Sequence, residues 1–199
     1  MKKLLISLIA SVALMSAAQA GDAVAGKAKA ATCGACHGAD GNSLAPNFPK
    51  IAAQGERYLV KQITDIKNGV RQVPEMTGFV SALTETDIAD IAAFYASQST
   101  ASGAADPALV EAGKRIFLGG NEATGVPACI ACHGAGGKGM GAAGFPRVAG
   151  QHAAYTEKQL KDFYNAKRSN DASSVMRDIA SRMHMDEIKA VSSYIQGLK

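Results

Sequence analysis

The sequence predicts an all-α protein built of two similar domains in tandem. Apolar residues recur at helical spacing in several segments, and no segment alternates between apolar and polar residues for long enough to indicate a sheet. The two halves of the chain repeat one another, and one cysteine motif occurs once in each half. We therefore expect two helical units, each organised around its own copy of that motif.

Capping residues and apolar stripes predict the individual helices. Asp22 is placed to cap a first helix, and Asp106 followed by Pro107 predicts the equivalent start in the second half. Thr84 and Asp87 have the spacing of a capping box. The apolar stripes lie at Leu59, Ile63, Ile66 and Val70, at Ile88, Ile91 and Tyr95, at Leu160 and Phe163, and at Ile188, Val191 and Ile195.

The internal repeat predicts the domain boundaries. Residues 47–54 (NFPKIAAQ) return 97 residues later as residues 144–151 (GFPRVAGQ), whereas the offset is 96 at the cysteines and 100 towards the C-terminal ends. Residues 97–105 are rich in Ser, Ala and Gly, which suits a linker. We expect a first domain at residues 21–96 and a second at 106–199. The same repeat pairs Tyr58, Lys61, Gln62, Asp65 and Arg71 with Tyr155, Lys158, Gln159, Asp162 and Arg168.

The N-terminus has the pattern of a secretory signal peptide at residues 1–20. Two lysines precede an apolar run at residues 4–15, and the small-residue site Ala-Gln-Ala ends at Ala20. The apolar run is too short to span a membrane. We expect cleavage after Ala20 and export to a bacterial periplasm.

Every cysteine of the chain lies in one of two Cys-x-x-Cys-His motifs, at residues 33–37 and 129–133. This pattern is typical of covalent haem c attachment, because two thiols reach the vinyl groups of one porphyrin while the adjacent imidazole binds the iron. A thioredoxin-like redox pair, half of a zinc site or a disulfide would use similar spacing. Two copies, each followed by His, favour two haem c groups. The residues predicted to hold them are Cys33, Cys36, Cys129 and Cys132, with His37 and His133 as axial ligands.

Methionine is expected on the opposite face of each iron. Met76 follows His37 by 39 residues and is the only methionine in residues 21–105. Met176 aligns with Met76 at the offset of 100 residues, so it is the predicted ligand of the second iron. His/Met ligation raises the haem potential and leaves no open coordination position.

The other methionines and histidines fit that role less well. Met140 follows the second motif too closely to cross the porphyrin. Met183 aligns with Leu83, so a role in the core is expected, although it is the next candidate after Met176; Met185 is expected at the surface. The two remaining histidines have no counterparts in the first half and are expected at exposed or capping positions; they are His152 and His184.

The charge pattern excludes a nucleic-acid partner. Residues 21–105 carry seven basic and eight acidic side chains, and residues 106–199 carry twelve and nine. The basic residues are scattered and form no stripe. The excess in the second half fits either an ordinary solvated surface or orientation towards a charged redox partner.

On these residues the chain resembles the dihaem cytochromes c4, in which two class I cytochrome c domains are fused. The resemblance rests on the two motifs, the twin Phe-Pro segments, Met76 in Glu-Met-Thr-Gly, Met176 in Val-Met-Arg and the closing residues 192–197 (SSYIQG). It implies domains related by a pseudo-twofold axis, with haems close enough to exchange electrons. One departure is His184, where the repeat predicts a Ser or Thr cap as at Thr84.

The resemblance also implies a periplasmic one-electron carrier and not an enzyme. Its expected partners are a terminal respiratory oxidase and an upstream quinol-oxidising complex or other cytochromes, with loose association with the membrane. A dihaem peroxidase is the rival from the enzyme class, but it needs an iron with an exchangeable or vacant site, whereas each half offers a methionine. A docking subunit of a larger redox complex is the other alternative.

The repeated Phe-Pro segments predict how each proximal imidazole is held. A haem-ligating histidine usually donates its other N–H to a nearby acceptor. Pro49 and Pro146 stand at equivalent positions, and the fixed φ of proline helps to place a backbone carbonyl. We therefore expect His37 Nδ1 and His133 Nδ1 to donate to carbonyls of these segments.

Overall fold

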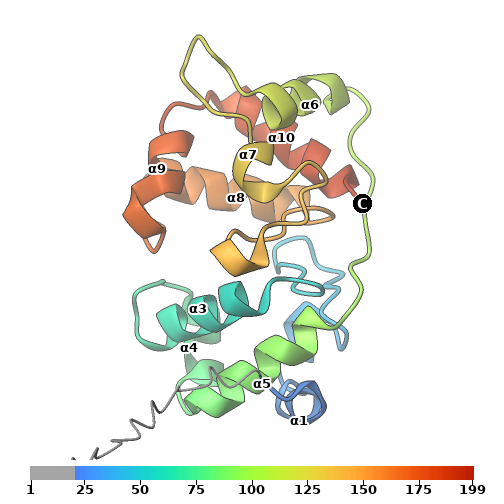
Figure 1. The fold of residues 1–199 in the computed structure, drawn as a ribbon, viewed down its shortest axis with the longest axis vertical. Coiled ribbons are helices and arrows are strands. Elements are labelled where there is room, and N and C mark those ends of the chain that lie inside the picture. Colours follow the sequence, from blue (N-terminus) through green and yellow to red (C-terminus); the bar gives the residue numbers. More distant parts are fainter. Residues whose placement is uncertain (1–20) are drawn as a thin grey trace, which may run out of the picture.

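The computed structural model describes residues 21–199, so the expected signal peptide at residues 1–20 lies outside the described part. The described chain consists of helices and turns, with isolated β-bridges between Asn121 and Val126 and between Met140 and Phe145. The helices form two groups stacked one above the other (Figure 1). The all-α expectation is confirmed.

The first group begins after Asp22, whose carboxylate accepts hydrogen bonds from Val24 N (2.8 Å) and Ala25 N (3.2 Å). The predicted capping box forms, since Asp87 N donates to Thr84 Oγ1 (3.1 Å) and Thr84 N donates to Asp87 Oδ2 (2.9 Å). The last helix of the group packs on the first and third helices around buried apolar residues. The elements are α1 (Ala23–Lys29), α2 (Gly34–His37), α3 (Glu56–Lys67), α4 (Pro74–Val80) and α5 (Glu85–Ala96).

The second group repeats this arrangement. Its last helix packs on α6 and α8 around a core in which Phe117 and Ile188 are fully buried. The predicted apolar residues of the last helix and Leu160 face this core, whereas Phe163 is buried under the guanidinium of Arg168. The elements are α6 (Val110–Gly119), α7 (Ile130–His133), η1 (Gly141–Ala143), α8 (Ala153–Tyr164), η2 (Ala172–Ser174), α9 (Val175–Ala180) and α10 (Met185–Gly197).

Two local predictions were wrong. Asp106 does not cap a helix: its side chain accepts from Ala108 N (2.9 Å) in a turn, and α6 begins only at Val110. Val70 does not extend the apolar stripe of α3, because the helix ends at Lys67 and Gly69 turns the chain at φ 72°. Val70 is therefore 57% exposed.

Glycines allow the first and last helices of each group to touch. A Cβ on Gly26 in α1 would lie 1.9 Å from the carbonyl oxygen of Asp90 in α5. A Cβ on Gly113 in α6 would lie 2.3 Å from the carbonyl oxygen of Ala190 in α10. The two crossings are equivalent, so each half has the same close helix pair.

The second group contains an insertion ahead of its cysteine motif. Cys33 follows Gly26 by seven residues, whereas Cys129 follows Gly113 by sixteen. The added residues form a tight turn closed by hydrogen bonds between the backbones of Asn121 and Val126, at 2.8 and 2.9 Å. Val126 is 3% exposed, so the insertion also contributes to the second core.

The segment predicted as a linker is bonded to both groups of helices. It runs along one side of the molecule from α5 to α6 (Figure 1). Thr100 Oγ1 donates to the carbonyl of Ala52 in the first group (2.6 Å), and Gly103 N donates to that of Gln196 in the second (3.1 Å). The segment is thus a fixed strap and not a loose tether.

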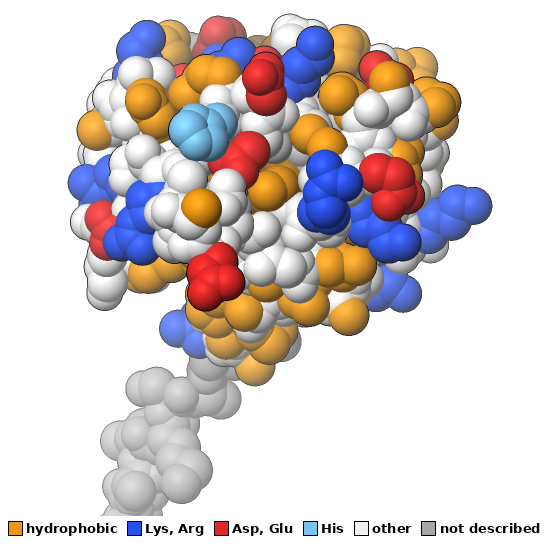
Figure 2. Space-filling model, turned by 90° about the horizontal axis from the view of Figure 1, so that it is seen from above, with side chains coloured by type: hydrophobic (Ala, Val, Ile, Leu, Met, Phe, Trp, Pro, Cys, Tyr) orange, Lys and Arg blue, Asp and Glu red, His pale blue; other side chains and the backbone are white. Residues whose placement is uncertain are grey.

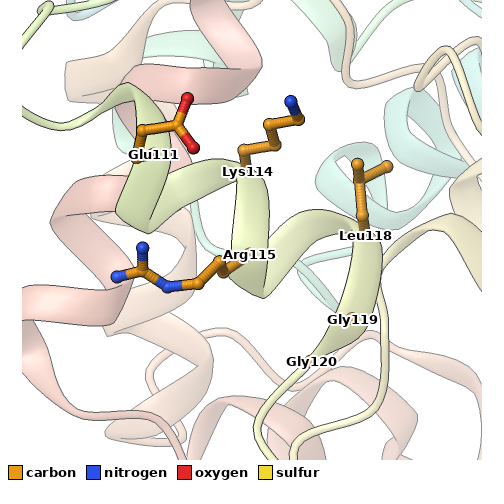
Figure 3. Close-up of a pocket in the computed structure, with 6 residues that line it drawn as sticks. All are labelled: Glu111, Lys114, Arg115, Leu118, Gly119 and Gly120. Atoms are coloured by element: carbon orange, nitrogen blue, oxygen red, sulfur yellow. The ribbon is translucent and has the colours of Figure 1, made fainter.

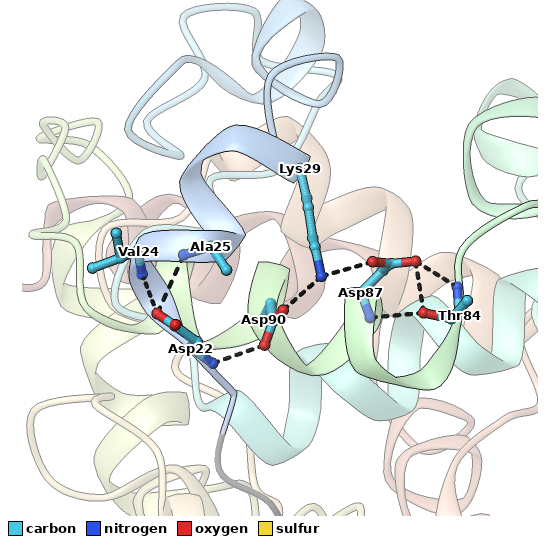
Figure 4. Close-up of polar contacts among 7 residues, drawn as sticks. All are labelled: Asp22, Val24, Ala25, Lys29, Thr84, Asp87 and Asp90. Atoms are coloured by element: carbon cyan, nitrogen blue, oxygen red, sulfur yellow. Dashed lines mark hydrogen bonds and ion pairs between the residues drawn. The ribbon is translucent and has the colours of Figure 1, made fainter.

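An ion-pair cluster joins α1 to α5 (Figure 4). Lys29 Nζ lies 2.7 Å from Asp87 Oδ1 and 2.6 Å from Asp90 Oδ2. The other oxygen of Asp90 accepts from Asp22 N at 2.8 Å. The hydrogen bonds from Lys29 lower the pKa of both carboxyl groups.

We expect Gly113→Ala to lower the free energy of unfolding by about 3 kcal/mol, since the added methyl group forces α6 away from α10. Gly119→Ala is the matched control at the end of the same helix, because its Cβ would meet no atom within 4 Å. The control should keep or slightly raise stability. Urea unfolding followed by circular dichroism measures both, and equal midpoints would contradict this role of Gly113.

Because of the ion pairs on Lys29, the free energy of unfolding should depend on pH. Because the folded-state pKa of Asp87 and Asp90 is lowered, their contribution is present above the ordinary carboxyl pKa of about 4 and is lost as the pH falls towards the folded values. Lys29→Met removes the cation. The difference in urea midpoint between wild type and variant should therefore shrink from pH 7 to pH 3, and a constant difference would argue against the ion pairs.

Candidate haem sites and the interface between domains

Each cysteine motif forms one short helical turn that ends in its histidine. In α2, His37 N donates to the carbonyl of Cys33 (3.0 Å), and in α7, His133 N donates to that of Cys129 (2.9 Å). Gly38 then reverses the chain at φ 80°, where a Cβ would lie 2.8 Å from the carbonyl oxygen of Asn42. The motif is thus held as a compact loop that presents its thiols and imidazole together.

The four thiols are free and partly buried, and none forms a disulfide. Burial raises the pKa of Cys33, and it raises the pKa of Cys129 to about 11. Redox-active Cys-x-x-Cys pairs show the opposite shift, because they work through a stabilised thiolate. The environment therefore argues against a thioredoxin-like pair.

The predicted hydrogen bonds of the proximal imidazoles are confirmed. His37 Nδ1 lies 2.9 Å from the carbonyl oxygen of Pro49, and His133 Nδ1 lies 2.8 Å from that of Pro146. Because a carbonyl oxygen only accepts, Nδ1 must carry the hydrogen in both rings. The Phe-Pro segments thereby fix the tautomer and the ring orientation.

The imidazoles are prepared to bind a metal through Nε2. Burial lowers the pKa of His37 and of His133, which keeps both rings neutral near pH 7. With the hydrogen on Nδ1, the lone pair of Nε2 is available to a metal ion. The chemistry of these donors fits the iron of a haem covalently held by the adjacent thiols.

The methionines differ in burial in the way that the repeat predicts. Met183 is 4% exposed within the second core, whereas Met185 and Met140 are 43% and 40% exposed. Met176 in α9 is partly buried and packs against the same core as Cys129. Met76 in α4 is also partly buried, but it is not among the residues packed against the first core.

The two remaining histidines precede helices. His184 lies before α10, and Glu187 Oε2 accepts from its backbone N–H at 2.8 Å, so the helix start has a polar partner despite the missing Ser or Thr. His152 lies before α8, but its ring also reaches the other domain: Nε2 is 2.8 Å from the carbonyl oxygen of Ser43.

Comparison with known proteins agrees with this geometry. The family model described as cytochrome c matches residues 23–99 and again 110–199. Cytochrome c4 of Pseudomonas aeruginosa is 56% identical over 200 residues, covering 100% of both chains. The chain belongs to the cytochrome c4 family. It is a dihaem electron-transfer protein with two covalently attached haem c groups.

Solved and shorter relatives support the same assignment. The crystal structure of reduced recombinant cytochrome c4 from Pseudomonas stutzeri has a TM-score of 0.88 and 53% identity, covering 90% of this chain and 100% of that one. Cytochrome c-554(548) of Halomonas halodenitrificans is 46% identical over 82 residues, which is 40% of this chain and 99% of its own. Across residues 21–199, no helix combines the length and apolarity needed to cross a membrane.

The Phe-Pro segments of this cytochrome c4 also form the interface between its domains. The side-chain amide of Gln54 donates to the carbonyl oxygen of Arg147 (2.9 Å) and accepts from its N–H (2.8 Å). The amide of Gln151 makes the same two bonds with Lys50, at 2.8 and 2.9 Å. Each segment therefore accepts a hydrogen bond from its own histidine and is hydrogen-bonded to the other segment through a glutamine.

A second set of crossed contacts joins α3 to α8. Two arginines each bond to a glutamine of their own domain and to a tyrosine and a glutamine of the other. This pattern indicates a pseudo-twofold relation between the domains. The bonds run from Arg71 to Gln62 (2.9 Å), Tyr155 (2.9 Å) and Gln159 (3.0 Å), and from Arg168 to Gln159 (2.9 Å), Tyr58 (3.0 Å) and Gln62 (3.1 Å).

Sequence reasoning missed the role of these residues, although the signal was present. The glutamines, tyrosines and arginines recur at equal offsets, so the repeat marked them as special. Pairing across an interface could not be inferred, because it depends on how the domains are placed.

A buried guanidinium nitrogen is left for the cofactor. Arg147 Nε is buried and has no hydrogen-bond partner among the described residues, and burial lowers the pKa of this guanidinium. A buried N–H donor of this kind needs an acceptor. The carboxylates of a haem supply one, so the site fits the group that the cysteine motifs imply.

A shallow surface hollow elsewhere takes no part in this site. It lies along α6 (Figure 3) and is lined by none of the predicted haem-binding residues. Its lining consists of Glu111, Lys114, Arg115, Leu118, Gly119 and Gly120.

Proposed function

We propose that this protein is a periplasmic one-electron carrier that passes electrons through two His/Met-ligated haems to a terminal respiratory oxidase. In this proposal the four cysteines carry the porphyrins, and His37 with Met76 and His133 with Met176 are the axial ligands. The observation that carries it is the pair of neutral imidazoles, His37 buried and His133 partly buried, each with Nδ1 bonded to a prolyl carbonyl beside two free thiols.

The haems supply reversible one-electron chemistry between ferric and ferrous iron. The protein's residues keep that chemistry outer-sphere. The prolyl carbonyls hold the imidazoles in one tautomer, and the methionine thioethers close the opposite coordination position and favour the reduced state. Partial burial of the thiols and methionines limits the access of water and small ligands to the iron.

The two domains act as a single conduit with partners at the outer ends. The glutamine contacts support this proposal because they join the segments that hold the proximal histidines. The electron then needs no relative motion of the domains. The strap that bonds to both domains keeps their distance fixed.

Uneven charge then orients the partners. Residues 106–199 carry the basic excess and residues 21–105 are slightly acidic. Seen from the end of the second domain, Lys and Arg side chains are spread among acidic and apolar ones (Figure 2). This mixed surface suits brief encounters with an oxidase at one end and with a quinol-oxidising complex or another cytochrome at the other, with only loose contact with the membrane.

We expect Met76→His and Met176→His each to lower the potential of one haem, by roughly 0.1–0.3 V within the ~0.8 V range that axial ligands span. Both haems should stay covalently attached, because the cysteines are untouched. Potentiometric titration checks this. If Met176→His leaves both potentials and the methionine-to-iron absorption band unchanged, Met183 becomes the candidate ligand.

Electron transfer to the oxidase should slow as salt is added. Ionic strength screens the charges that orient the two proteins, and the Debye length falls to about 8 Å near 0.15 M. Stopped-flow rates measured from low to high salt test this. Rates that do not depend on salt would exclude electrostatic orientation while leaving the conduit intact.

A further inference from the structure

The segment that leads into α9 differs from its counterpart in the first domain. The repeat offset rises from 97 residues at Arg168 to 100 residues at Met176, so three residues are added just before the methionine. In the first domain Pro74 opens α4 two residues before Met76, and the fixed φ of proline sets the start of that helix. The second domain has no proline there, so other contacts must set the start of α9.

The added residues take an unfavourable backbone conformation. Ser173 has φ 52° and ψ 27°, and Ser174 has φ 59° and ψ 18°. Residues other than glycine rarely adopt this left-handed backbone conformation. Two consecutive residues keep it only when surrounding contacts enforce it. The segment therefore depends on what holds its two ends.

Asp171 closes the segment onto the helix start. Its Oδ2 accepts from Arg177 N (3.0 Å) and its Oδ1 accepts from Arg177 Nε (2.8 Å). The Asp171 side chain is 6% exposed, so water does not compete strongly for these bonds. Both bonds end on the residue directly after Met176. In the first domain Thr77 stands at the position of Arg177, and no such pair forms among the described residues.

The other end of the segment is fixed to the first domain. Asn170 Nδ2 donates to Gln62 Oε1 (2.9 Å) and to Asp65 Oδ2 (2.6 Å), and its carbonyl accepts from Lys61 Nζ (3.0 Å). Its counterpart at the offset of 97 residues is Val73, which offers no side-chain polar group. The segment thus runs between an interdomain anchor at Asn170 and the clasp formed by Asp171 and Arg177.

We propose that Asp171 is a positioning residue for Met176: by binding the backbone and side chain of Arg177, it holds the start of α9 so that the thioether stays on the second haem iron. This inference rests on the proposed ligation by Met176. The first haem uses proline for the same purpose, so the two methionines are held by different means. Loss of Asp171 should free Met176 and leave Met76 unaffected.

The test isolates the second haem in the full-length holoprotein. In a Met76→His background only the second haem keeps a methionine ligand, so the methionine-to-iron band and the binding of imidazole to the ferric protein report that haem alone. Imidazole competes with the thioether for the iron. Asp171→Ala should weaken the band and raise the imidazole affinity about tenfold, because two charge-assisted hydrogen bonds are lost.

Three further variants sharpen the result. Asp171→Asn keeps an amide oxygen that can accept from Arg177 N, and Arg177→Ala keeps the backbone donor. The imidazole affinity of both variants should therefore fall between that of the parent and that of Asp171→Ala. Asp178→Asn is the matched control, since this exposed carboxylate of α9 forms no ion pair within the described residues. It should bind imidazole as the parent does.

Failure of the inference and failure of the proposed ligation give different results. An imidazole affinity within about twofold of the parent in Asp171→Ala, with the band intact, would overturn the positioning role. Persistence of the band in a Met76→His, Met176→His double variant would instead show that Met176 is not the ligand. If Asp171→Ala does not retain two attached haems, the imidazole affinity and the absorption band of Asp171→Asn and Arg177→Ala decide the question. An imidazole affinity equal to that of the parent in both variants would overturn the inference.

Discussion

The hydrogen bond from each proximal imidazole to a prolyl carbonyl is the contact on which the rest of the arrangement depends. It fixes the tautomer of His37 and His133 and so leaves Nε2 available to the proposed haem iron. The same short segments continue into Lys50 and Arg147, which the opposing glutamines bind. Orientation of the proposed metal ligand and docking of the domains are therefore properties of one stretch of chain.

The two domains share a plan but are not equivalent. The close helix crossings at Gly26 and Gly113 and the glutamine contacts are repeated, whereas the turn at residues 121–126 and the segment before α9 occur only in the second half. The proximal side of each haem site is thus held in the same way in both domains. The segments that carry the proposed ligands Met76 and Met176 are not, so the two proposed sites differ on that side.

Spacing and periodicity were sufficient for most of the fold and for the chemistry of the site. The cysteine motifs, the prolyl carbonyls and the burial of Met183 follow from local pattern and from aligning the two halves. Local pattern failed where tertiary contacts compete with it. Asp106 uses its carboxylate within a turn while its N–H donates to Ser193 Oγ (2.9 Å), so α6 starts later than the Asp-Pro pair suggests.

The interface and the segment before α9 lay beyond sequence reasoning for another reason. Gln54 and Arg168 are prominent in the repeat, but their partners belong to the opposite domain, and no spacing rule specifies a contact across 90 or more residues. Asn170, Asp171 and Arg177 have no matching partners in the first half, so the repeat gave no signal for them.

The crossed contacts between the domains have the form of a homodimer interface. Gln54 binds the segment that contains Gln151, and Gln151 binds the segment that contains Gln54; Arg71 meets Tyr155 as Arg168 meets Tyr58. Such isologous pairing is what two identical chains make about a twofold axis. A gene duplication that fused two copies of an ancestral single-haem dimer would produce it. In such a fusion the association is independent of concentration, and the second copy is released from the need to match the first.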